Sequence, residues 1–418
     1  MKNYDFIDAV QNASGSTSLQ VKTVAGVTGG VTGDVKGDAS ADMQEAAFAD
    51  KAILPNLDGI RAMACLLVVV SHMPLPGKPA TLGALGVGVF FVLSGFLMSH
   101  LYARAQWDFK AVSLYVIARF SRIAPIYWLV VSACIVISLL EPDSDFPMRI
   151  AGATQIARHY LFGGSGYVFW SIPPEIQYYI FFLVVWWAIA HRARLPYAMP
   201  LIALVCAALL LTHSVWPGLT LPNKLHLFLA GTAAGLAPRV MWRDSQDKTL
   251  LWCLQLAALV LLLTPLWLYA TQPDLYSATE LGIALAVAVY LLSISSRWTT
   301  PVFASLWMRK IGQASFSIYL MHVLVFHFGM RLFGLNRTQY DPMWLVLGVA
   351  AVIIPMVASR YVEIPLQKKT RRALEARFGF VPAARPLPAS GPSPMNTPTH
   401  TPTNNPMNTP MNSQMNTK

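Results

Sequence analysis

The chain has 418 residues, of which 55% are hydrophobic and only 12% are charged. Soluble domains carry about 25% charged residues, so this composition excludes an ordinary soluble protein. The many apolar runs are each long enough to cross a hydrocarbon core of about 30 Å, and they are continuous rather than alternating, which argues against a membrane β-barrel. The formal net charge of +11 does not indicate nucleic acid, because basic residues in membrane proteins collect in cytoplasmic loops.

These properties predict an all-α polytopic membrane protein with about ten transmembrane helices. The predicted spans are 57–75, 84–103, 113–140, 171–190, 197–216, 223–241, 250–270, 277–296, 312–333 and 342–364. The segment 141–170 contains EPDSDFP and GGSGYVF. It is too polar and too rich in glycine for a span, so we expect an outer loop with one short helix.

Two segments flank the predicted spans. Residues 1–52 are rich in Gly, Ser, Thr, Val and Asp without helical periodicity, which predicts a disordered N-terminal extension. Residues 373–418 are first basic and then low in complexity, and such a Pro/Asn/Thr/Met-rich tail cannot form a core. The transmembrane domain is therefore expected to occupy residues 53–372. The opening residues MKNYDFIDAVQN lack the apolar stretch of a signal peptide, so we expect the first span to direct insertion.

Basic residues are distributed unevenly over the predicted loops. With the N-terminus in the cytoplasm, the inner loops carry seventeen Lys and Arg residues, from Arg104 to Arg377. The outer loops carry six: Lys78, Arg149, Arg158, Lys224, Arg331 and Arg337. Cytoplasmic loops are enriched in Lys and Arg, so this bias predicts that both termini are cytoplasmic.

The first span contains two ionisable residues, Arg61 at its start and His72 eleven residues later. That spacing corresponds to about 16 Å of helix rise, which places His72 beyond the midplane. Ionisable side chains within a bilayer cost roughly 2.5–3.5 kcal/mol and by default indicate a functional site. A histidine in an apolar helix can also be an interhelical hydrogen-bond partner, so the residue alone leaves both interpretations open.

The second and third spans add small residues and arginines. The stretch 83-GALGVGVFFVLSGF-96 carries small side chains that allow two helices to approach closely. Arg119 and Arg122 lie three residues apart at the cytoplasmic edge of the third span and share one helix face. They are either interfacial arginines that extend towards water or a clamp for phosphates, for which guanidinium geometry is well suited.

The fourth and ninth spans supply the remaining candidates. In 170-WSIPPEIQYYIFF-182, two prolines suit a helix start and Glu175 follows in the first turn. Its carboxylate either stabilises the helix dipole or faces a polar cleft together with His72. In 315-SFSIYLMHVLVFH-327, His322 falls near mid-membrane, where a structural and a functional role are both open.

The four cysteines, Cys65, Cys134, Cys206 and Cys253, lie in apolar runs at unrelated spacings. This pattern predicts small core residues rather than a disulfide framework or a metal site. We expect no metal and no tightly bound cofactor.

In this order, the motifs resemble acyltransferase family 3, the bacterial integral-membrane O-acyltransferases that modify cell-surface polysaccharides. The resemblance covers about residues 53–370 and rests on five motifs: R-x10-H from Arg61 to His72, GVGVFFVLSGF, R-x-x-R from Arg119 to Arg122, W-S-x-x-x-E from Trp170 to Glu175, and S-I-Y-L-M-H up to His322. The chain departs from the family at Gly88, where Asp is common, and around Glu175, where the family has V-E-E or V-E-Q. It also lacks the G-D-S motif of an appended esterase-like domain, so we expect the membrane domain to act alone.

The resemblance implies an enzyme of the bacterial inner membrane that takes an acyl group, usually acetyl, from cytoplasmic acyl-CoA. The implied acceptor is a sugar hydroxyl of a polysaccharide or a lipid-linked oligosaccharide on the outer side, with membrane lipids as surroundings and no nucleic acid. Three residues are implied to bind the donor: Arg61, Arg119 and Arg122.

Our mechanistic hypothesis is that His72 is the general base for the attack of the sugar hydroxyl and that Glu175 orients its imidazole. Neutral imidazole has an ordinary pKa near 6.5, so the base form is available at neutral pH. Trp170, Tyr178 and His322 are expected to contact substrate. Direct transfer and an acyl-histidine intermediate both remain open, as do the acceptor sugar and the acyl chain.

Two other classes of protein fit part of this pattern. A polytopic transporter also places His, Glu and Arg within the membrane, but the two halves of this chain show no convincing internal repeat. An acyl-translocating or scaffold subunit of a polysaccharide assembly system would share the motifs without completing the transfer. Acyl-CoA consumption by the purified protein separates the enzyme from both.

Overall fold

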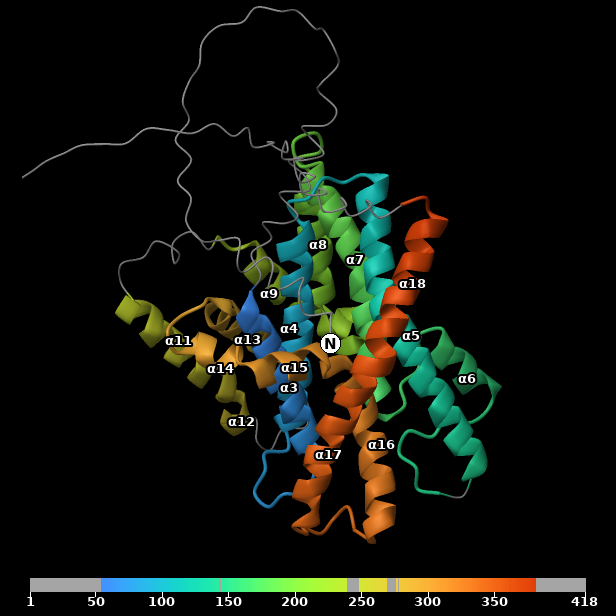
Figure 1. The fold of residues 1–418 in the computed structure, drawn as a ribbon. Helices are drawn as coiled ribbons and strands as arrows, with labels where there is room; N and C mark the ends of the chain where they lie inside the picture. Colours follow the sequence, from blue (N-terminus) through green and yellow to red (C-terminus); the bar gives the residue numbers. More distant parts are fainter. Residues whose placement is uncertain (1–53, 143, 239–247, 269–275, 277, 381–418) are drawn as a thin grey trace, which may run out of the picture. The chain divides into compact units, whose positions relative to one another are not determined.

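The computed structural model describes residues 54–380 except 143, 239–247, 269–275 and 277. The chain divides into two units, Met1–Ile53 and Leu54–Lys418. The first unit and the tail beyond residue 380 lie outside the described residues, and so does the prediction of disorder for residues 1–52. Of the tail predicted for residues 373–418, only residues 373–380 are described, and α18 (Ile364–Arg377) extends into them. Every regular element of the described residues is helical, as the sequence predicts (Figure 1).

Each predicted span overlaps a helix. The helices are α3 (Pro55–Ser71), α4 (Leu82–Tyr102), α5 (Phe109–Leu140), α7 (Ile172–Ala190), α8 (Ala198–Leu211), α9 (Leu221–Leu236), α11 (Lys248–Leu263) with α12 (Pro265–Leu268), α13 (Thr279–Ser293), α16 (Ser315–Phe333) and α17 (Met343–Ala358). Six helical segments of the described residues are long and apolar enough to cross a membrane. They contain α4, α5, α7, α11, α16 and α17. The protein is therefore a multi-pass membrane protein.

The core forms around α4, which packs against both α3 and α9. Small residues make the α4–α9 contact possible, as the glycine-rich second span predicts. A Cβ atom on Gly95 would lie 2.1 Å from the carbonyl oxygen of Phe228, and one on Gly231 would lie 2.0 Å from that of Val92. Both distances are far inside van der Waals contact, so the two backbones touch at these positions and any larger side chain would separate them.

The segment 141–170 contains one short helix, α6 (Ala153–Tyr160), as expected. A 3₁₀ turn, η2 (Tyr167–Ser171), leads directly into α7, which begins with prolines in its first turn. Proline suits this position because its missing N–H would have no helical partner there. The turn places Ser171 and Glu175 at the start of α7, next to α4.

Two short helices between α13 and α16 were not predicted. They are α14 (Thr299–Phe303) and α15 (Leu306–Gln313), and both pack against α3. The carbonyl of Asp58 comes so close to Gly312 that a Cβ there would lie 1.9 Å away. The side chain of Asn56 donates to the carbonyls of Leu292 and Ile294 at 3.0 and 3.2 Å. These contacts hold the polar start of α3 in place.

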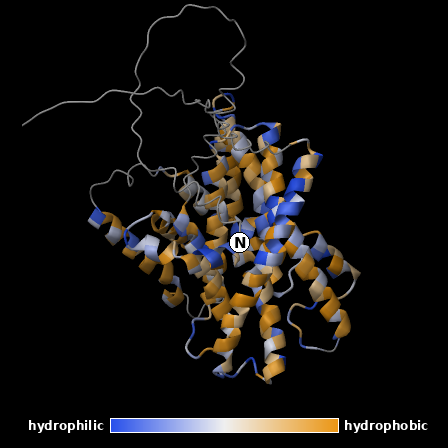
Figure 2. Cartoon of the chain, in the orientation of Figure 1, coloured by the Kyte–Doolittle hydropathy of each residue, from blue (hydrophilic) through white to orange (hydrophobic). Residues whose placement is uncertain are grey.

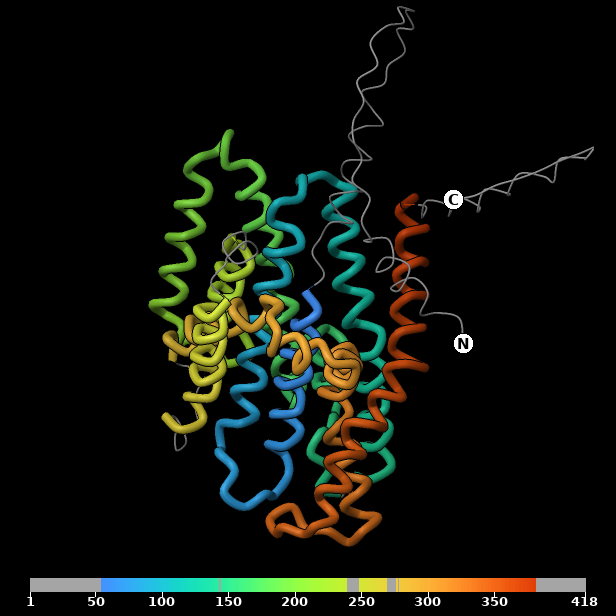
Figure 3. The backbone as a smooth tube through the Cα atoms, turned by 60° about the vertical axis from the view of Figure 1, so that its left-hand side comes forward, coloured from blue at the N-terminus to red at the C-terminus, as the bar shows by residue number. Residues whose placement is uncertain are grey.

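The last helices form one long rod. Helix α17 continues through a π-helical turn, η5 (Ser359–Glu363), into α18 (Ile364–Arg377). Figure 2 shows α17 almost wholly hydrophobic and α18 largely hydrophilic, and Figure 3 shows the two following one another without a break. Helix α16 packs against α17 and ends at Gly334, whose φ of +63° is the left-handed conformation typical of a helix C-cap.

One prediction about small core residues is wrong. Cys65, Cys134 and Cys206 are buried, but Cys253 is exposed on α11. Within an apolar run, the sequence does not show which residues face other helices and which face lipid, because both environments are apolar.

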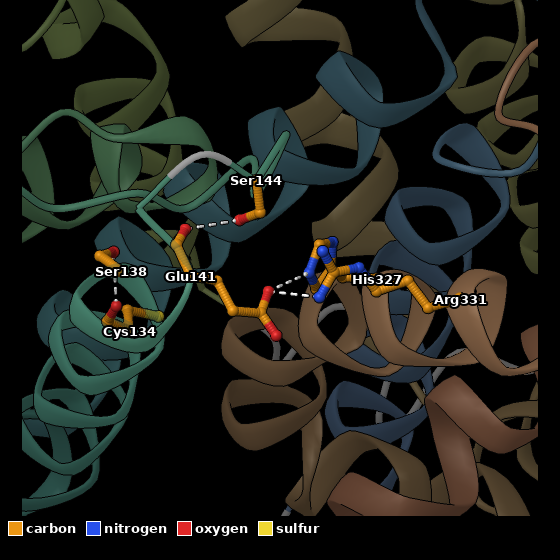
Figure 4. Close-up of polar contacts among 6 residues, drawn as sticks. All are labelled: Cys134, Ser138, Glu141, Ser144, His327 and Arg331. Atoms are coloured by element: carbon orange, nitrogen blue, oxygen red, sulfur yellow. Dashed lines mark hydrogen bonds and ion pairs between the residues drawn. The ribbon is translucent and has the colours of Figure 1, made fainter.

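A polar cluster connects the C-terminal end of α5 to α16. The carboxylate of Glu141 forms an ion pair with Arg331, and its Oε2 lies 3.7 Å from Nε2 of His327 (Figure 4). We call these three residues the Glu141 cluster.

Candidate functional site

Four of the predicted site residues line one cavity: Arg61, Arg119, Arg122 and Glu175. The cavity has about 710 Å³ of space between its walls, counting its open side. Helices α3, α4, α5, α7 and α16 contribute to it. Its apolar lining includes Phe90, Phe91, Leu97, Met98, Phe316 and Tyr319. We call it the arginine cavity.

The arginines of this cavity are incompletely paired. Arg119 lies between two aromatic rings, with its guanidinium carbon 5.9 Å from the centroids of Tyr102 and Tyr179. Within the described residues, its buried Nε has no hydrogen-bond partner. Such an atom is costly unless a ligand or water satisfies it. The nearest anion to Arg61 is Asp58, with a nitrogen–oxygen distance of 3.7 Å.

Glu175 is held by two hydroxyl groups rather than by a histidine. Its Oε1 accepts from Tyr179 at 2.6 Å and from Ser94 at 3.0 Å. Tyr179 is one helical turn after Glu175, so both side chains lie on one face of α7. The carboxylate is therefore fixed inside the arginine cavity, and His72 is not among the described residues that line this cavity.

His72 lies outside this cavity and contacts His322. It is the C-cap residue of α3, and its Nδ1 is 3.3 Å from Nε2 of His322. The ring of Tyr167 lies 5.5 Å away between centroids. The two histidines come from helices α3 and α16, which are 250 positions apart at this contact. His322 is fully buried, whereas His72 is partly exposed.

The hydrogen-bond partners assign the tautomers of this histidine pair. Nδ1 of His72 is 2.9 Å from the carbonyl oxygen of Val68. Nδ1 of His322 faces the carbonyls of Ile318 and Tyr319, at 3.0 and 2.8 Å. A carbonyl only accepts, so each neutral ring carries its proton on Nδ1. The His72 Nδ1–H then also faces the Nε2 lone pair of His322, and Nε2 of His72 is left to accept a proton.

Tyr319 lies between the arginine cavity and the histidine pair. It lines the cavity and is followed one turn later on α16 by His322. Its hydroxyl accepts from Ser171 and donates to the carbonyl of Val168, both at 2.8 Å. Tyr319 therefore connects the two groups of polar residues: it lines the arginine cavity, and its ring centroid lies 6.2 Å from that of His322.

The other two predicted substrate residues lie elsewhere. The ring of Tyr178 stacks on Phe228 with centroids 4.3 Å apart, and its hydroxyl contacts Thr232 inside the core. Trp170 packs against Phe91 and Tyr276. Neither residue lines the arginine cavity.

Tyr179, Ser94 and Tyr319 line the cavity and were missed by reasoning from the sequence. The spacing of four residues from Glu175 to Tyr179 could have indicated the first of them, because residues four apart share a helix face. Ser94 and Tyr319 stand inside motifs that were recognised, but nothing in their spacing distinguishes them from packing residues.

The arrangement is that of a membrane protein whose candidate site has two parts, a cationic cavity and a histidine pair. A cationic cavity in the helical core suits an anionic ligand, because three guanidinium groups face a single carboxylate there. A histidine pair beside it offers one ring nitrogen that can accept a proton. This combination suits group transfer from an anionic donor.

Comparisons with known proteins agree with that description. Residues 54–360 match the acyltransferase-3 family model, described as an acyltransferase domain. The chain belongs to this family of acyltransferases.

The curated relatives include the peptidoglycan O-acetyltransferase OatA of Listeria monocytogenes, 24% identical over 367 residues, which cover 78% of this chain and 58% of OatA. A putative O-acetyltransferase of Staphylococcus aureus is also 24% identical, over 79% of this chain and 60% of its own length. Acyltransferase MdmB of Streptomyces mycarofaciens is 25% identical over 73% of this chain and 87% of its own length. The chain thus spans about three fifths of the first two relatives. No solved structure is significantly similar to it.

Proposed function

We propose that this protein is a bacterial inner-membrane O-acyltransferase that moves an acyl group, acetyl in the simplest case, from cytoplasmic acyl-CoA to a sugar hydroxyl. The sugar belongs to a cell-envelope or exported saccharide, and the name of the Listeria relative, a peptidoglycan O-acetyltransferase, supports this class of acceptor. All ten predicted spans cross the membrane in this proposal, with both termini in the cytoplasm.

The observation that carries the proposal is the arginine cavity. Three guanidinium groups and one carboxylate line it, and the Nε of Arg119 has no partner within the described residues. The three arginines are partly exposed, but an excess of positive charge in a largely apolar cavity is still unfavourable without a counter-ion. The phosphates of coenzyme A supply that negative charge, and planar guanidinium groups bind phosphate oxygens in pairs. Arg61, Arg119 and Arg122 are therefore assigned to the donor.

Glu175 has a positioning role in this assignment. Its carboxylate, held by Tyr179 and Ser94, lies in the same cavity as the three arginines. It balances part of their charge and limits where the phosphates can bind. The sequence made Glu175 the candidate for orienting the imidazole of His72. We assign that role to His322 instead.

His72 is the general base of the transfer step. Its Nε2 lone pair takes the proton of the acceptor hydroxyl while the hydroxyl oxygen attacks the thioester carbonyl. The new ester C–O bond forms, the C–S bond breaks, and the proton passes from His72 to the departing thiolate of coenzyme A. His322 accepts from Nδ1–H of His72 throughout and stabilises the imidazolium that forms transiently.

The thioester has to travel from the arginine cavity to His72. The acyl end of coenzyme A is on a long flexible arm, while the phosphates are at the other end. The arm extends past Phe90 and Tyr319, whose ring centroids are 6.3 Å apart at the cavity wall. Tyr319 must move for the arm to pass.

The test is transfer by the purified protein in detergent. Labelled acetyl-CoA and envelope saccharide are supplied, and both free coenzyme A and acetylated saccharide are measured. We expect both products from the wild type and neither from His72→Ala. Coenzyme A release without any acetylated saccharide would instead support an acyl-translocating role, and no consumption of acetyl-CoA would overturn the proposal.

A further inference from the structure

The segment between α6 and α7 has a strained backbone where it approaches His72. Tyr167, the first residue of η2, has a φ of +47°, a left-handed conformation that is unfavourable for a bulky side chain. Phe162, five residues earlier, is also left-handed, with a φ of +59°. Within the described residues, no other residue except glycine has a positive φ. Such strain persists only where the surrounding structure imposes it, and it is typical of functional sites.

Packing on both sides of this segment imposes the strained conformation. The ring of Phe162 stacks on that of Trp128 in α5, with the centroids 5.6 Å apart. The buried ring of His159 fills the inside of the turn, since a Cβ atom on Gly164 would lie 2.2 Å from it. Tyr167, in contrast, is 43% exposed. The segment is therefore held in a strained conformation that presents a tyrosine to its surroundings instead of burying it.

Tyr167 provides an open aromatic surface beside the proposed base. The ring centroids of Tyr167 and His72 are 5.5 Å apart, and the ring of His322 lies 4.8 Å from that of His72. A tyrosine ring combines an apolar face with a polar hydroxyl. It can therefore pack against the C–H groups of a sugar ring while the hydroxyls of that sugar stay free to react.

Two cations from other connecting segments lie at the same place. Lys78, between α3 and α4, donates from its ammonium to the carbonyls of the residues before and after His72. Arg337, between α16 and α17, is exposed, and its charge acts on both His72 and Tyr167. Within the described residues, the charged side chains that act on His72 are these two, and both are positive. Two positive charges acting on one small region favour a negatively charged group there.

We propose that the acceptor is an acidic saccharide, whose sugar ring packs on Tyr167 while Lys78 and Arg337 bind its carboxylate or phosphate group. This proposal rests on the proposed function and adds the charge of the acceptor and the residues that bind it. The planar guanidinium of Arg337 can bind two oxygens of such a group, whereas the ammonium of Lys78 acts as a point charge. A hydroxyl of the bound saccharide then lies beside His72, whose Nε2 takes its proton.

The binding test uses the full-length protein in detergent, without donor, and three oligosaccharides of equal length. One contains a uronic acid, the second is the same compound with its carboxyl groups reduced to alcohols, and the third carries a phosphate in place of the carboxylate. We expect the better of the two acidic probes to bind about tenfold more tightly than the reduced one, equivalent to about 1.4 kcal/mol. The difference should shrink as the salt concentration rises. Equal binding of all three would overturn the proposal.

Variants separate the contribution of charge from that of the aromatic ring. Arg337→Gln should remove most of the preference for the acidic probe and leave binding of the reduced probe unchanged, because it deletes only a charge. Tyr167→Ala should weaken both probes alike, whereas Tyr167→Phe keeps the ring and should bind both. Arg149→Gln is the matched control, since Arg149 is another exposed outer-loop arginine and is not among the charges that act on His72. If it reduced the preference as much as Arg337→Gln, the overall surface charge would explain the preference and the proposal would fail.

The transfer test distinguishes this proposal from the proposed function. We expect Arg337→Gln to raise the KM for the acidic acceptor about tenfold and to leave the KM for acetyl-CoA unchanged. Equally efficient acetylation of the reduced and the acidic saccharide by the wild type would leave the proposed function intact and overturn the acidic acceptor. If His72→Ala kept full transfer while the acidic probe still bound as expected, the proposed function would fail and the acceptor site would stand.

Discussion

Two regions of the molecule are built from the same residue types: the arginine cavity with its neighbouring histidine pair, and the Glu141 cluster. They differ in how completely their charged groups are paired. In the Glu141 cluster, Arg331 is 46% exposed and pairs with a carboxylate on another helix. Three arginines line the cavity together with Glu175, and the buried Nε of Arg119 has no partner within the described residues. A paired charge at a helix end connects two helices, whereas several cations with too few anions around one cavity indicate a place for an anionic ligand.

Two histidines of α16, five residues apart, show the same difference between the proposed site and the Glu141 cluster. His322 and His327 are both buried, at 0% and 1% exposure. His322 uses both ring nitrogens, one towards backbone carbonyls and the other towards His72. His327 packs on Phe146 and approaches Glu141 at 3.7 Å. Burial alone therefore does not distinguish a histidine that positions the proposed base, such as His322, from one that joins two helices, such as His327. The hydrogen-bond or ion-pair partner of each ring does.

The largest effect is expected at His72. His72→Ala should lower kcat by about 10²–10⁴, because general base catalysis contributes that much. The measurement is acetyl transfer by purified protein, with His327→Ala as the control that removes a buried histidine from the other region. A His72→Ala protein that inserts normally and keeps more than about a tenth of wild-type transfer would disprove the assignment.

Arg119→Ala should raise the KM for acyl-CoA about 10–100-fold, because a hydrogen bond to a charged group contributes about 1.5–3 kcal/mol. Arg122→Ala should act in the same direction. Arg331→Ala is the matched control and should leave this KM unchanged. If the KM for the acceptor rose while the affinity for the donor stayed constant, the cavity would belong to the acceptor instead.

His322→Leu should lower kcat about tenfold with little change in either KM, because it removes one of the two acceptors that Nδ1–H of His72 faces, the other being the carbonyl of Val68, but no substrate contact. His322→Gln keeps an acceptor oxygen near the same place and should recover part of the loss. Steady-state kinetics of the two variants check this. Equal losses in both, accompanied by poor insertion, would mean that His322 serves only packing.

Two neighbouring tyrosines test the boundary of the cavity. Tyr179→Phe removes a hydroxyl that donates to Glu175 at 2.6 Å, and should lower kcat/KM about three- to tenfold. Tyr178→Phe removes a hydroxyl buried against Thr232, and should leave kcat/KM within about twofold while lowering stability. A larger kinetic effect at Tyr178 would restore it as a substrate residue.

The smallest kinetic effect is expected in the Glu141 cluster. Glu141→Gln should reduce stability by at most about 1 kcal/mol, because ion pairs of this exposure contribute about 0.2–1 kcal/mol, and should leave kcat and both KM values unchanged. Thermal inactivation and kinetics of the same preparation measure the two effects. A clear kinetic defect without loss of stability would show that the two regions are not separate in function.

The sequence predicted helices at the observed positions because membrane spans need long continuous apolar runs, and such runs are local. It also singled out Arg61, Arg119, Arg122 and Glu175, because charge inside or beside an apolar run is conspicuous. It missed α14 and α15, whose residues show no long apolar run. Their position against α3 comes from contacts with residues about 250 positions away, such as that between Gly312 and Asp58.

By itself, the sequence determined the class of the protein: an all-helical, multi-pass membrane chain with the motifs of an acyltransferase family. Those properties depend on composition and short spacings, which a chain carries whether or not it is folded. Only the tertiary structure decided the partners of each group: Glu175 with Tyr179 and Ser94, His72 with His322, and Tyr319 between them. Partners on different helices depend on how the helices rotate and pack, and that is set by the whole core rather than by any one span.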